Sequence, residues 1–167
     1  MGGHIDISAF DTNLGISYSK YASDALGRDL WIVKKAFSYS LDGVGVAKVV
    51  VPQGYLTDGA SVPRAFWSFF PPWGRYGQAA VLHDWLCEYL GYWDGDNWTR
   101  ISRKEADNIL NDAMKELGVS KATRVTMYTA VKLYTTLSGE TEQTYDPRKH
   151  EVEKFLLQHY KDTGQWL

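Results

Sequence analysis

The chain has 167 residues, of which 44% are hydrophobic and 23% charged, and its formal net charge is −2. These values are typical of one soluble globular domain, and the lack of a long basic run excludes a nucleic-acid-binding arm. The one cysteine, Cys87, excludes an intrachain disulfide and a cysteine-based zinc cluster. No apolar stretch approaches the ~20 residues that span a bilayer, and the N-terminus lacks the features of a signal peptide. We therefore expect a protein that is made in a cytoplasm and has no transmembrane segment.

The first part of the chain, residues 1–60, is predicted to be rich in strands. Residues 30–41 carry many β-branched and aromatic side chains, and Asp42-Gly43 follows them as a strong turn pair. Residues 47–51 are therefore expected to form the antiparallel return strand. Residues 10–20 are a weaker strand candidate, because asparagine and glycine interrupt them.

From residue 61 to the end, the apolar spacing becomes that of helices. Ser61 is suited to cap a short helix that carries Trp67. Ser102 and Glu105 form a capping box at the start of another helix. Residues 91–101 are expected to be a polar, aromatic loop. The longer helices are predicted at residues 75–90, 102–117, 121–137 and 147–161.

The order of these elements predicts an α+β fold in a single domain, residues 1–167. It consists of a small N-terminal antiparallel β-sheet, in the strand-rich residues 1–60, followed by a C-terminal bundle of about four helices, in residues 61–167. The helix over residues 75–90 is apolar almost all round, which predicts burial on several sides.

His83 and Asp84 stand out because they lie within this apolar helix. A buried ionisable pair is costly unless it is hydrogen-bonded, ion-paired or bound to a metal. Asp107 lies on the edge of the apolar stripe of the next helix, so we expect it to face His83 if the two helices are antiparallel. A carboxylate on one imidazole nitrogen leaves the other nitrogen free to act as a base.

Asp84 points about 100° away from its neighbour His83 on a helix, so it must have a different partner. The turn at residues 57–61 offers Asp58 and the backbone of Gly59. Together with Asp84, these oxygens are of the kind that binds a hard cation such as Ca²⁺.

Simpler interpretations remain open. A buried histidine hydrogen-bonded to an aspartate is common in proteins without catalytic activity, and Asp58 before a glycine is also typical of an Asx-turn. Cys87 lies one turn after His83, where it is either a nucleophile paired with the histidine or a small core residue. Asp94-Gly-Asp-Asn97 offers oxygen ligands but lacks the glutamate of an EF-hand loop.

Three segments together resemble a family of phage and prophage proteins that carries only a domain-of-unknown-function label. They are the TDGASVPR string that starts at Thr57, the AAVLHD string that ends at Asp84, and the EAD string that ends at Asp107. The resemblance covers roughly residues 30–135. It implies a viral origin and no established chemistry.

His83-Asp84 followed by Asp107 on the next helix is also similar to the pattern of secreted phospholipase A2. That resemblance implies that His83 is a general base, Asp107 its orienting carboxylate and Asp84 a calcium ligand. It implies further calcium ligands at Asp58 and Gly59. Two departures are that those enzymes usually have disulfides, and that many have a tyrosine where this chain has Cys87.

These observations predict a phage-encoded, metal-assisted ester hydrolase that acts on phospholipid or another ester. We expect aromatic side chains to line its substrate-binding site, namely Trp67, Tyr92, Trp93 and Tyr128. The alternative is a non-enzymatic virion, tail or assembly component that binds phage structural proteins through an aromatic surface. Either protein would be found in the host cytoplasm during infection or in the virion.

Overall fold

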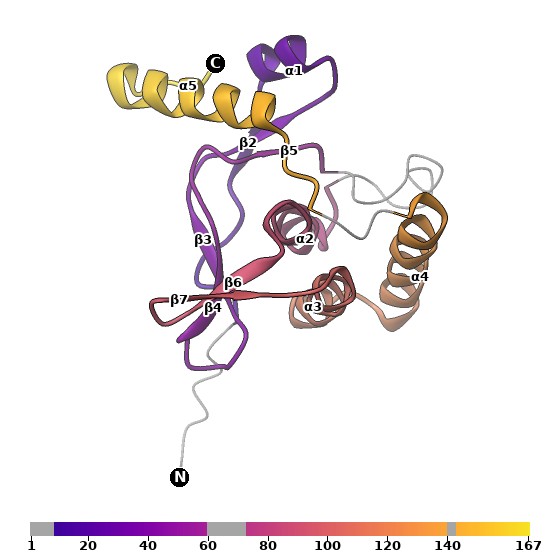
Figure 1. Ribbon diagram of the computed structural model, residues 1–167. Coiled ribbons are helices and arrows are strands. Elements are labelled where there is room, and N and C mark those ends of the chain that lie inside the picture. The colour runs from indigo at the N-terminus through magenta and orange to yellow at the C-terminus, as the bar shows by residue number, and fades with distance from the viewer. Residues whose placement is uncertain (1–8, 60–72, 140–142) are drawn as a thin grey trace.

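The computed structural model describes residues 9–59, 73–139 and 143–167, and strands predominate before the first gap. Two antiparallel sheets lie beside a group of helices, which confirms the expected α+β fold (Figure 1). The expected short helix that begins at Ser61 and carries Trp67 lies outside the described residues. Within them, no helix combines the length and the apolarity that crossing a membrane requires.

In the described part of the chain, seven short strands form two sheets, in the orders β1-β2-β5 and β3-β4-β6-β7. All pairings are antiparallel, and Phe37 opposes Val51 where β3 meets β4. The strands are β1 (Ile16–Tyr18), β2 (Trp31–Val33), β3 (Phe37–Ser40), β4 (Ala47–Val51), β5 (Leu56–Thr57), β6 (Gly91–Asp94) and β7 (Asn97–Arg100).

Each helix except α2 begins at a side chain that accepts a backbone N–H, as N-capping requires. The capping box of Ser102 and Glu105 is present as expected. Gly139 and Gly164 end the last two helices in the left-handed conformation. The helices are α1 (Lys20–Leu26), α2 (Gly77–Tyr89), α3 (Arg103–Glu116), α4 (Lys121–Ser138) and α5 (Pro147–Thr163).

Helix α2 lies at the centre of the fold, between the sheets and α3, and 11 of its 13 residues are buried. Its apolar side chains form one core with Phe37 and Val51 of the β3–β4 pair and with Leu110 of α3. A smaller core joins α1, β2, β5 and α5 around Ile32 and Leu156. Burial on every side explains why α2 shows no polar face, as its sequence predicted.

The prediction of a loop over residues 91–101 is wrong, because most of these residues form the β6–β7 hairpin. Gly95, which has a φ of +59°, lies in the two-residue turn of this hairpin. Trp93 faces Trp98 across the two strands. The hairpin extends the sheet from β4, a partner that local sequence does not reveal. The predicted strand over 30–41 is likewise interrupted, because β2 and β3 belong to different sheets.

Helix α1 was not expected: it begins at Lys20, the last residue of the weak strand candidate over residues 10–20, and no element was predicted for residues 21–26. Within that candidate only β1 is a strand, and Phe10 forms an isolated bridge to Tyr39. Ser19 caps α1 and Gly27 ends it. Packing of Ala22 in the smaller core holds this short helix in place.

Candidate functional site

The structure brings His83 and Asp107 together across the antiparallel helices α2 and α3. His83 Nε2 lies 2.8 Å from Asp107 Oδ1, and the imidazole is 1% exposed. Farther along the pair, the Ile101 N–H donates to the Leu90 carbonyl, which fixes the antiparallel alignment. An ionised carboxylate can only accept here, so Nε2 carries the proton and Nδ1 is the nitrogen left for other chemistry.

The Cys87 thiol shares the pocket of the imidazole. Its sulfur lies 3.7 Å from Nδ1 and 3.5 Å from Nε2 of His83, one helical turn earlier. Removal from water opposes protonation of the ring, but Cys87 and Asp107 outweigh it and raise the pKa of His83 to about 10. At neutral pH the pair is therefore an imidazolium beside a carboxylate, and His83 becomes a base only in alkaline solution.

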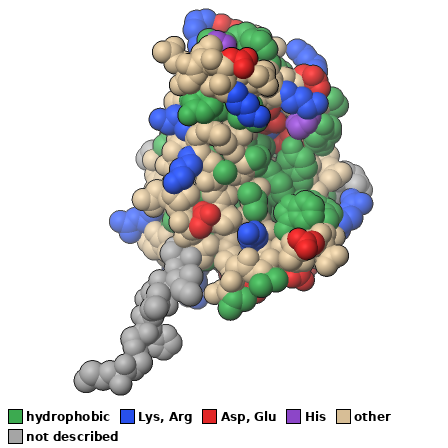
Figure 2. Space-filling model, turned by 90° about the vertical axis from the view of Figure 1, so that its left-hand side faces the viewer, with side chains coloured by type: hydrophobic (Ala, Val, Ile, Leu, Met, Phe, Trp, Pro, Cys, Tyr) green, Lys and Arg blue, Asp and Glu red, His purple; other side chains and the backbone are tan. Residues whose placement is uncertain are grey.

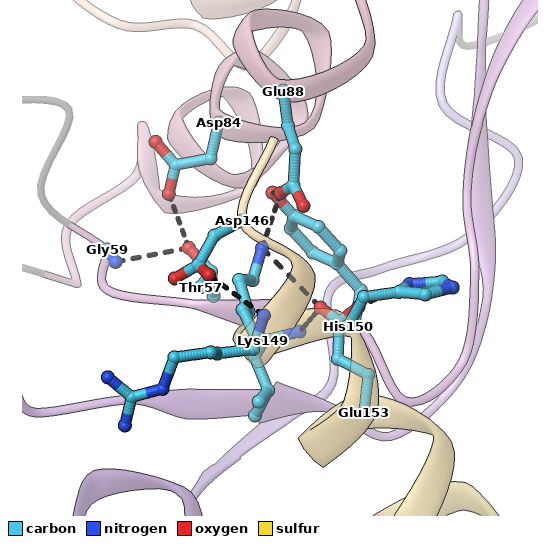
Figure 3. Close-up of polar contacts among 11 residues, drawn as sticks. Thr57, Gly59, Asp84, Glu88, Asp146, Lys149, His150 and Glu153 are labelled. Atoms are coloured by element: carbon cyan, nitrogen blue, oxygen red, sulfur yellow. Dashed lines mark hydrogen bonds and ion pairs between the residues drawn. The ribbon is translucent and has the colours of Figure 1, made fainter. Parts of the chain in front are cut away.

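Asp84, the next residue on α2, faces the turn that follows β5 (Figure 3). The Thr57 hydroxyl donates to Asp84 Oδ2 at 2.5 Å and accepts the Gly59 N–H at 3.1 Å. Gly59 has a φ of +65°, and a Cβ added there would lie 2.7 Å from the Trp73 ring. A glycine is thus needed both for the turn and for the close approach of Trp73.

Two carboxylates meet at this turn. Burial, and then the charge of Asp58, raise the pKa of Asp84 to about 7, although the Thr57 hydrogen bond opposes the shift. Carboxylate oxygens suit Ca²⁺, which also takes backbone carbonyls and water. In residues 9–59, 73–139 and 143–167, no three His, Cys, Asp or Glu side chains are placed to hold a metal. The fit to a cation therefore rests on Asp58 and Asp84, with Gly59 able to offer its carbonyl.

One turn beyond Asp84, a second polar cluster joins α2 to α5 (Figure 3). Lys149 Nζ lies 2.5 Å from Glu88 Oε2 and 3.4 Å from Glu153 Oε1, and all three side chains are buried. The Tyr55 hydroxyl donates to Glu88 Oε2 at 3.0 Å, and its ring lies below the ammonium. The Leu56 N–H donates to Glu153. A buried ion pair with added hydrogen bonds is first of all a structural connection.

The expected substrate-lining residues do not gather at His83. The Tyr128 hydroxyl donates to Asn108 Oδ1 at 2.9 Å, on the outer side of α3. Tyr92 is half-buried against the main core, whereas Trp93 is 42% exposed and packs edge-on against Trp98. Trp67 lies outside the described residues. The three expected lining residues that the structure describes therefore lie in the core or at the surface. None of these contacts brings them to the imidazole of His83.

Some residues of these clusters were not found from the sequence. Thr57 was seen only as part of a turn, although its place directly before Asp58 was a usable signal. Glu88 follows Asp84 by four residues, which places both on one helix face. Lys149 gave no signal at all, because its partner Glu88 lies 61 residues away in the chain.

A family model described as "Protein of unknown function (DUF1353)" matches residues 31–131. Over 67 residues the chain is 42% identical to "Uncharacterized protein y4jT" of Sinorhizobium fredii (strain NBRC 101917 / NGR234). The alignment covers 39% of this chain and 19% of that relative, so the chain spans about a fifth of the length of the curated relative it matches. No solved structure matches the chain. Because the family model covers more than half of the chain, from β2 to α4, the chain belongs to the DUF1353 family.

Proposed function

We propose that the chain is a metal-assisted hydrolase of carboxylic esters, with phospholipid as its substrate. One observation carries this proposal: the adjacent residues His83 and Asp84 each lie beside a different acidic residue. His83 pairs with Asp107 at 2.8 Å, while Asp84 lies beside Thr57 and Asp58 at the neighbouring turn. This arrangement supports a base with an orienting carboxylate next to two carboxylates of the kind that binds a cation.

In this proposal His83 accepts a proton from water at Nδ1 while Asp107 holds Nε2–H. The resulting hydroxide attacks the ester carbonyl, and the imidazolium then returns the proton to the leaving alcohol. Asp107 keeps the ring in one tautomer and stabilises its positive charge. The burial of His83 requires that the substrate ester reach Nδ1 past Cys87, which lies beside that nitrogen.

Asp84 and Asp58 would hold the cation, with the Gly59 carbonyl as a further ligand. A bound Ca²⁺ would supply positive charge to polarise the ester carbonyl. Thr57 would help to fix the orientation of Asp84, because its hydroxyl donates to Asp84 Oδ2.

A phage origin is part of the proposal and rests on the sequence motifs alone. The protein would then act in the host cytoplasm during infection or be carried in the virion, where phage structural proteins are its partners.

A second function, as a virion, tail or assembly component, is favoured by two observations. His83 is 1% exposed and protonated at neutral pH, as a structural ion pair would be. Hydrophobic side chains also gather on the face from which the β6–β7 hairpin projects (Figure 2). In the hairpin, the exposed Trp93 and Trp98 are in ring contact, and Trp98 also contacts the buried Trp85. Such an aromatic surface is suited to bind a partner subunit.

The experiment that separates the two functions compares wild type, H83A and a control, H159A, whose histidine lies on α5. Release of fatty acid from a short-chain phosphatidylcholine is followed with Ca²⁺ at alkaline pH. We expect H83A to lose about 10²–10⁴-fold in rate and H159A to match wild type. D107N, checked for folding by circular dichroism, should also be slow. An inactive wild type, or a fully active H83A, would refute the hydrolase, and stoichiometric protein in particles would favour the second function.

A further inference from the structure

Arg103 is a buried cation at the start of α3 that takes no part in the polar clusters around His83, Asp84 and Lys149. It is the first residue of α3, and its side chain is 9% exposed. Arg103 precedes Asp107 by four residues, so both side chains lie on the face of α3 that is buried against α2. The arginine therefore belongs to the same helix interface as the His83–Asp107 pair.

The antiparallel alignment of α2 and α3 shows which residue of α2 lies opposite Arg103. Asp107 faces His83, and toward the other end Ile101 bonds to Leu90. Arg103 thus lies level with Cys87, one turn from the imidazole. Helical side chains incline toward the N-terminus, which directs the guanidinium to the end of the helix pair.

Within the described residues, two of the three nitrogens of this guanidinium lack a hydrogen-bond partner. Nε and Nη1 of Arg103 are buried and have no hydrogen-bond acceptor within the described part of the chain. By contrast, Arg75 and Arg124 donate to backbone carbonyls, and the buried Lys149 is paired with Glu88 and Glu153. An arginine stays charged at any physiological pH, so two buried, unpaired N–H groups are strongly unfavourable without a ligand.

The end of α2 does not supply the missing acceptors. A cation near a helix C-terminus often bonds to the last free carbonyls. Here those of Leu86, Cys87, Tyr89 and Leu90 accept hydrogen bonds from Leu90, Thr144, Gln143 and Ile101 respectively. Arg103 is therefore not a capping residue of α2, and Nε and Nη1 remain without an acceptor.

We propose that Arg103, whose backbone lies one helical turn from the level of His83, binds the phosphate group of the substrate at the end of the helix pair. Arginine is well suited to this task, because its planar guanidinium donates several hydrogen bonds to phosphate oxygens. The choice of a phosphodiester rests on the proposed hydrolysis of phospholipid. The need for an anion rests on the unpaired N–H groups alone.

The test measures binding without hydrolysis. Glycerophosphocholine, inorganic phosphate and acetate are titrated separately into wild type, R103M and R100M, and the melting temperature is recorded. Arg100 is exposed on β7, so R100M is the matched loss of charge. We expect glycerophosphocholine to raise the melting temperature of wild type and R100M, and to leave R103M unchanged. A larger shift with inorganic phosphate would identify a free phosphate as the ligand, and a response to acetate alone would overturn the phosphate assignment.

A measurement on the wild type keeps the inference testable if R103M does not fold. The Nε–H resonance of Arg103, assigned by its loss in R103K, should shift during the glycerophosphocholine titration. An unmoved resonance, or an equal thermal shift in R103M, would overturn the inference. Binding without ester hydrolysis would refute the proposed function and leave the anion site standing. Hydrolysis of phosphatidylcholine by R103M with the same kcat and KM as wild type would support the proposed function and refute the anion site.

Discussion

The Thr57 hydroxyl donates a 2.5 Å hydrogen bond to Asp84 Oδ2, and this contact joins the turn after β5 to the centre of α2. Thr57 is 2% exposed, so no water replaces its hydroxyl when it is removed. We expect T57V, which keeps the shape of the side chain, to lower the free energy of unfolding by about 1–3 kcal/mol. Urea denaturation provides the measurement. T57S retains the hydroxyl and should lose much less, and equal stabilities of T57V and wild type would contradict the assigned role.

Gly59 provides a test of the turn itself. G59A adds a Cβ that lies 2.7 Å from the Trp73 ring at a φ of +65°. Gly139 has a φ of +67° with nothing within 4 Å, so G139A measures the backbone strain alone. We expect G139A to lose about 1–2 kcal/mol and G59A to lose roughly 1–3 kcal/mol more, because Trp73 must move. The comparison is made by thermal denaturation. Similar losses of stability in both variants would show that the Trp73 ring can move aside without a measurable cost.

The His83–Asp107 pair predicts how stability depends on pH. The folded protein holds a proton on His83 up to about pH 10, whereas the unfolded chain releases it near 6.5. The stabilisation is therefore fully present below pH 6.5 and is lost as the pH rises through 10. Urea unfolding at several pH values should show the loss in wild type and not in H83Q. If the two curves stay parallel from pH 7 to 10, the histidine is not a protonated partner of Asp107.

Asp84 predicts the pH dependence of cation binding. Its pKa is raised to about 7 by burial and by Asp58, so Ca²⁺ must displace a proton at pH 6 and much less at pH 8. We expect calorimetry to show tighter binding at pH 8 in wild type and no binding in D84N. D96N, in the exposed turn of the β6–β7 hairpin, serves as the control. Equal affinity at both pH values would place the cation elsewhere.

The raised pKa of Asp84 has a second consequence for the protein without a cation. The unfolded chain ionises this carboxyl near its ordinary pKa of 3.8, while the folded chain resists ionisation up to about 7. The contribution of Asp84 to stability therefore falls as the pH rises from about 4 to 7. Added Ca²⁺ should reverse this part of the loss, and the reversal should be missing in D84N.

Lys149 tests whether α5 is held by charge. K149M leaves Glu88 and Glu153 buried without their cation, which is expected to lower the free energy of unfolding by about 3–5 kcal/mol. K154M removes an exposed lysine that pairs with Glu151 on the same helix and should change stability by less than about 1 kcal/mol. Hydrogen exchange of α5 should accelerate in K149M. Unchanged exchange would show that the apolar contacts of Leu156 suffice.

The local signals in the sequence were enough for the central helices. Ser102 and Glu105 marked the start of α3, and the largely apolar sequence around His83 and Asp84 indicated that α2 is buried. Helical spacing then placed Asp107 on the edge of the apolar stripe of α3 and gave it as the partner of His83. Each of these inferences depends on residues that are close in the chain or share one helix face.

Contacts between distant segments were not accessible in this way. The β6–β7 hairpin is ordered by its pairing with β4, and that pairing gives no mark in the residues 91–101 themselves. The unpaired state of Arg103 is likewise a property of the assembled helix pair, because a sequence cannot reveal which carbonyls of α2 are already occupied. The roles of His83, Asp84 and Asp58 stay predictions.

The position of Lys149 also bears on how the chain matures during synthesis. The ribosome delivers Glu88 61 residues before the lysine that neutralises it, and the family match at residues 31–131 ends before that lysine. Until α5 emerges, Glu88 has the Tyr55 hydroxyl but no cation as a partner, so we expect water to remain around this carboxylate. Final consolidation of this protein is therefore expected late in translation, and nascent chains that stop before α5 should remain sensitive to protease.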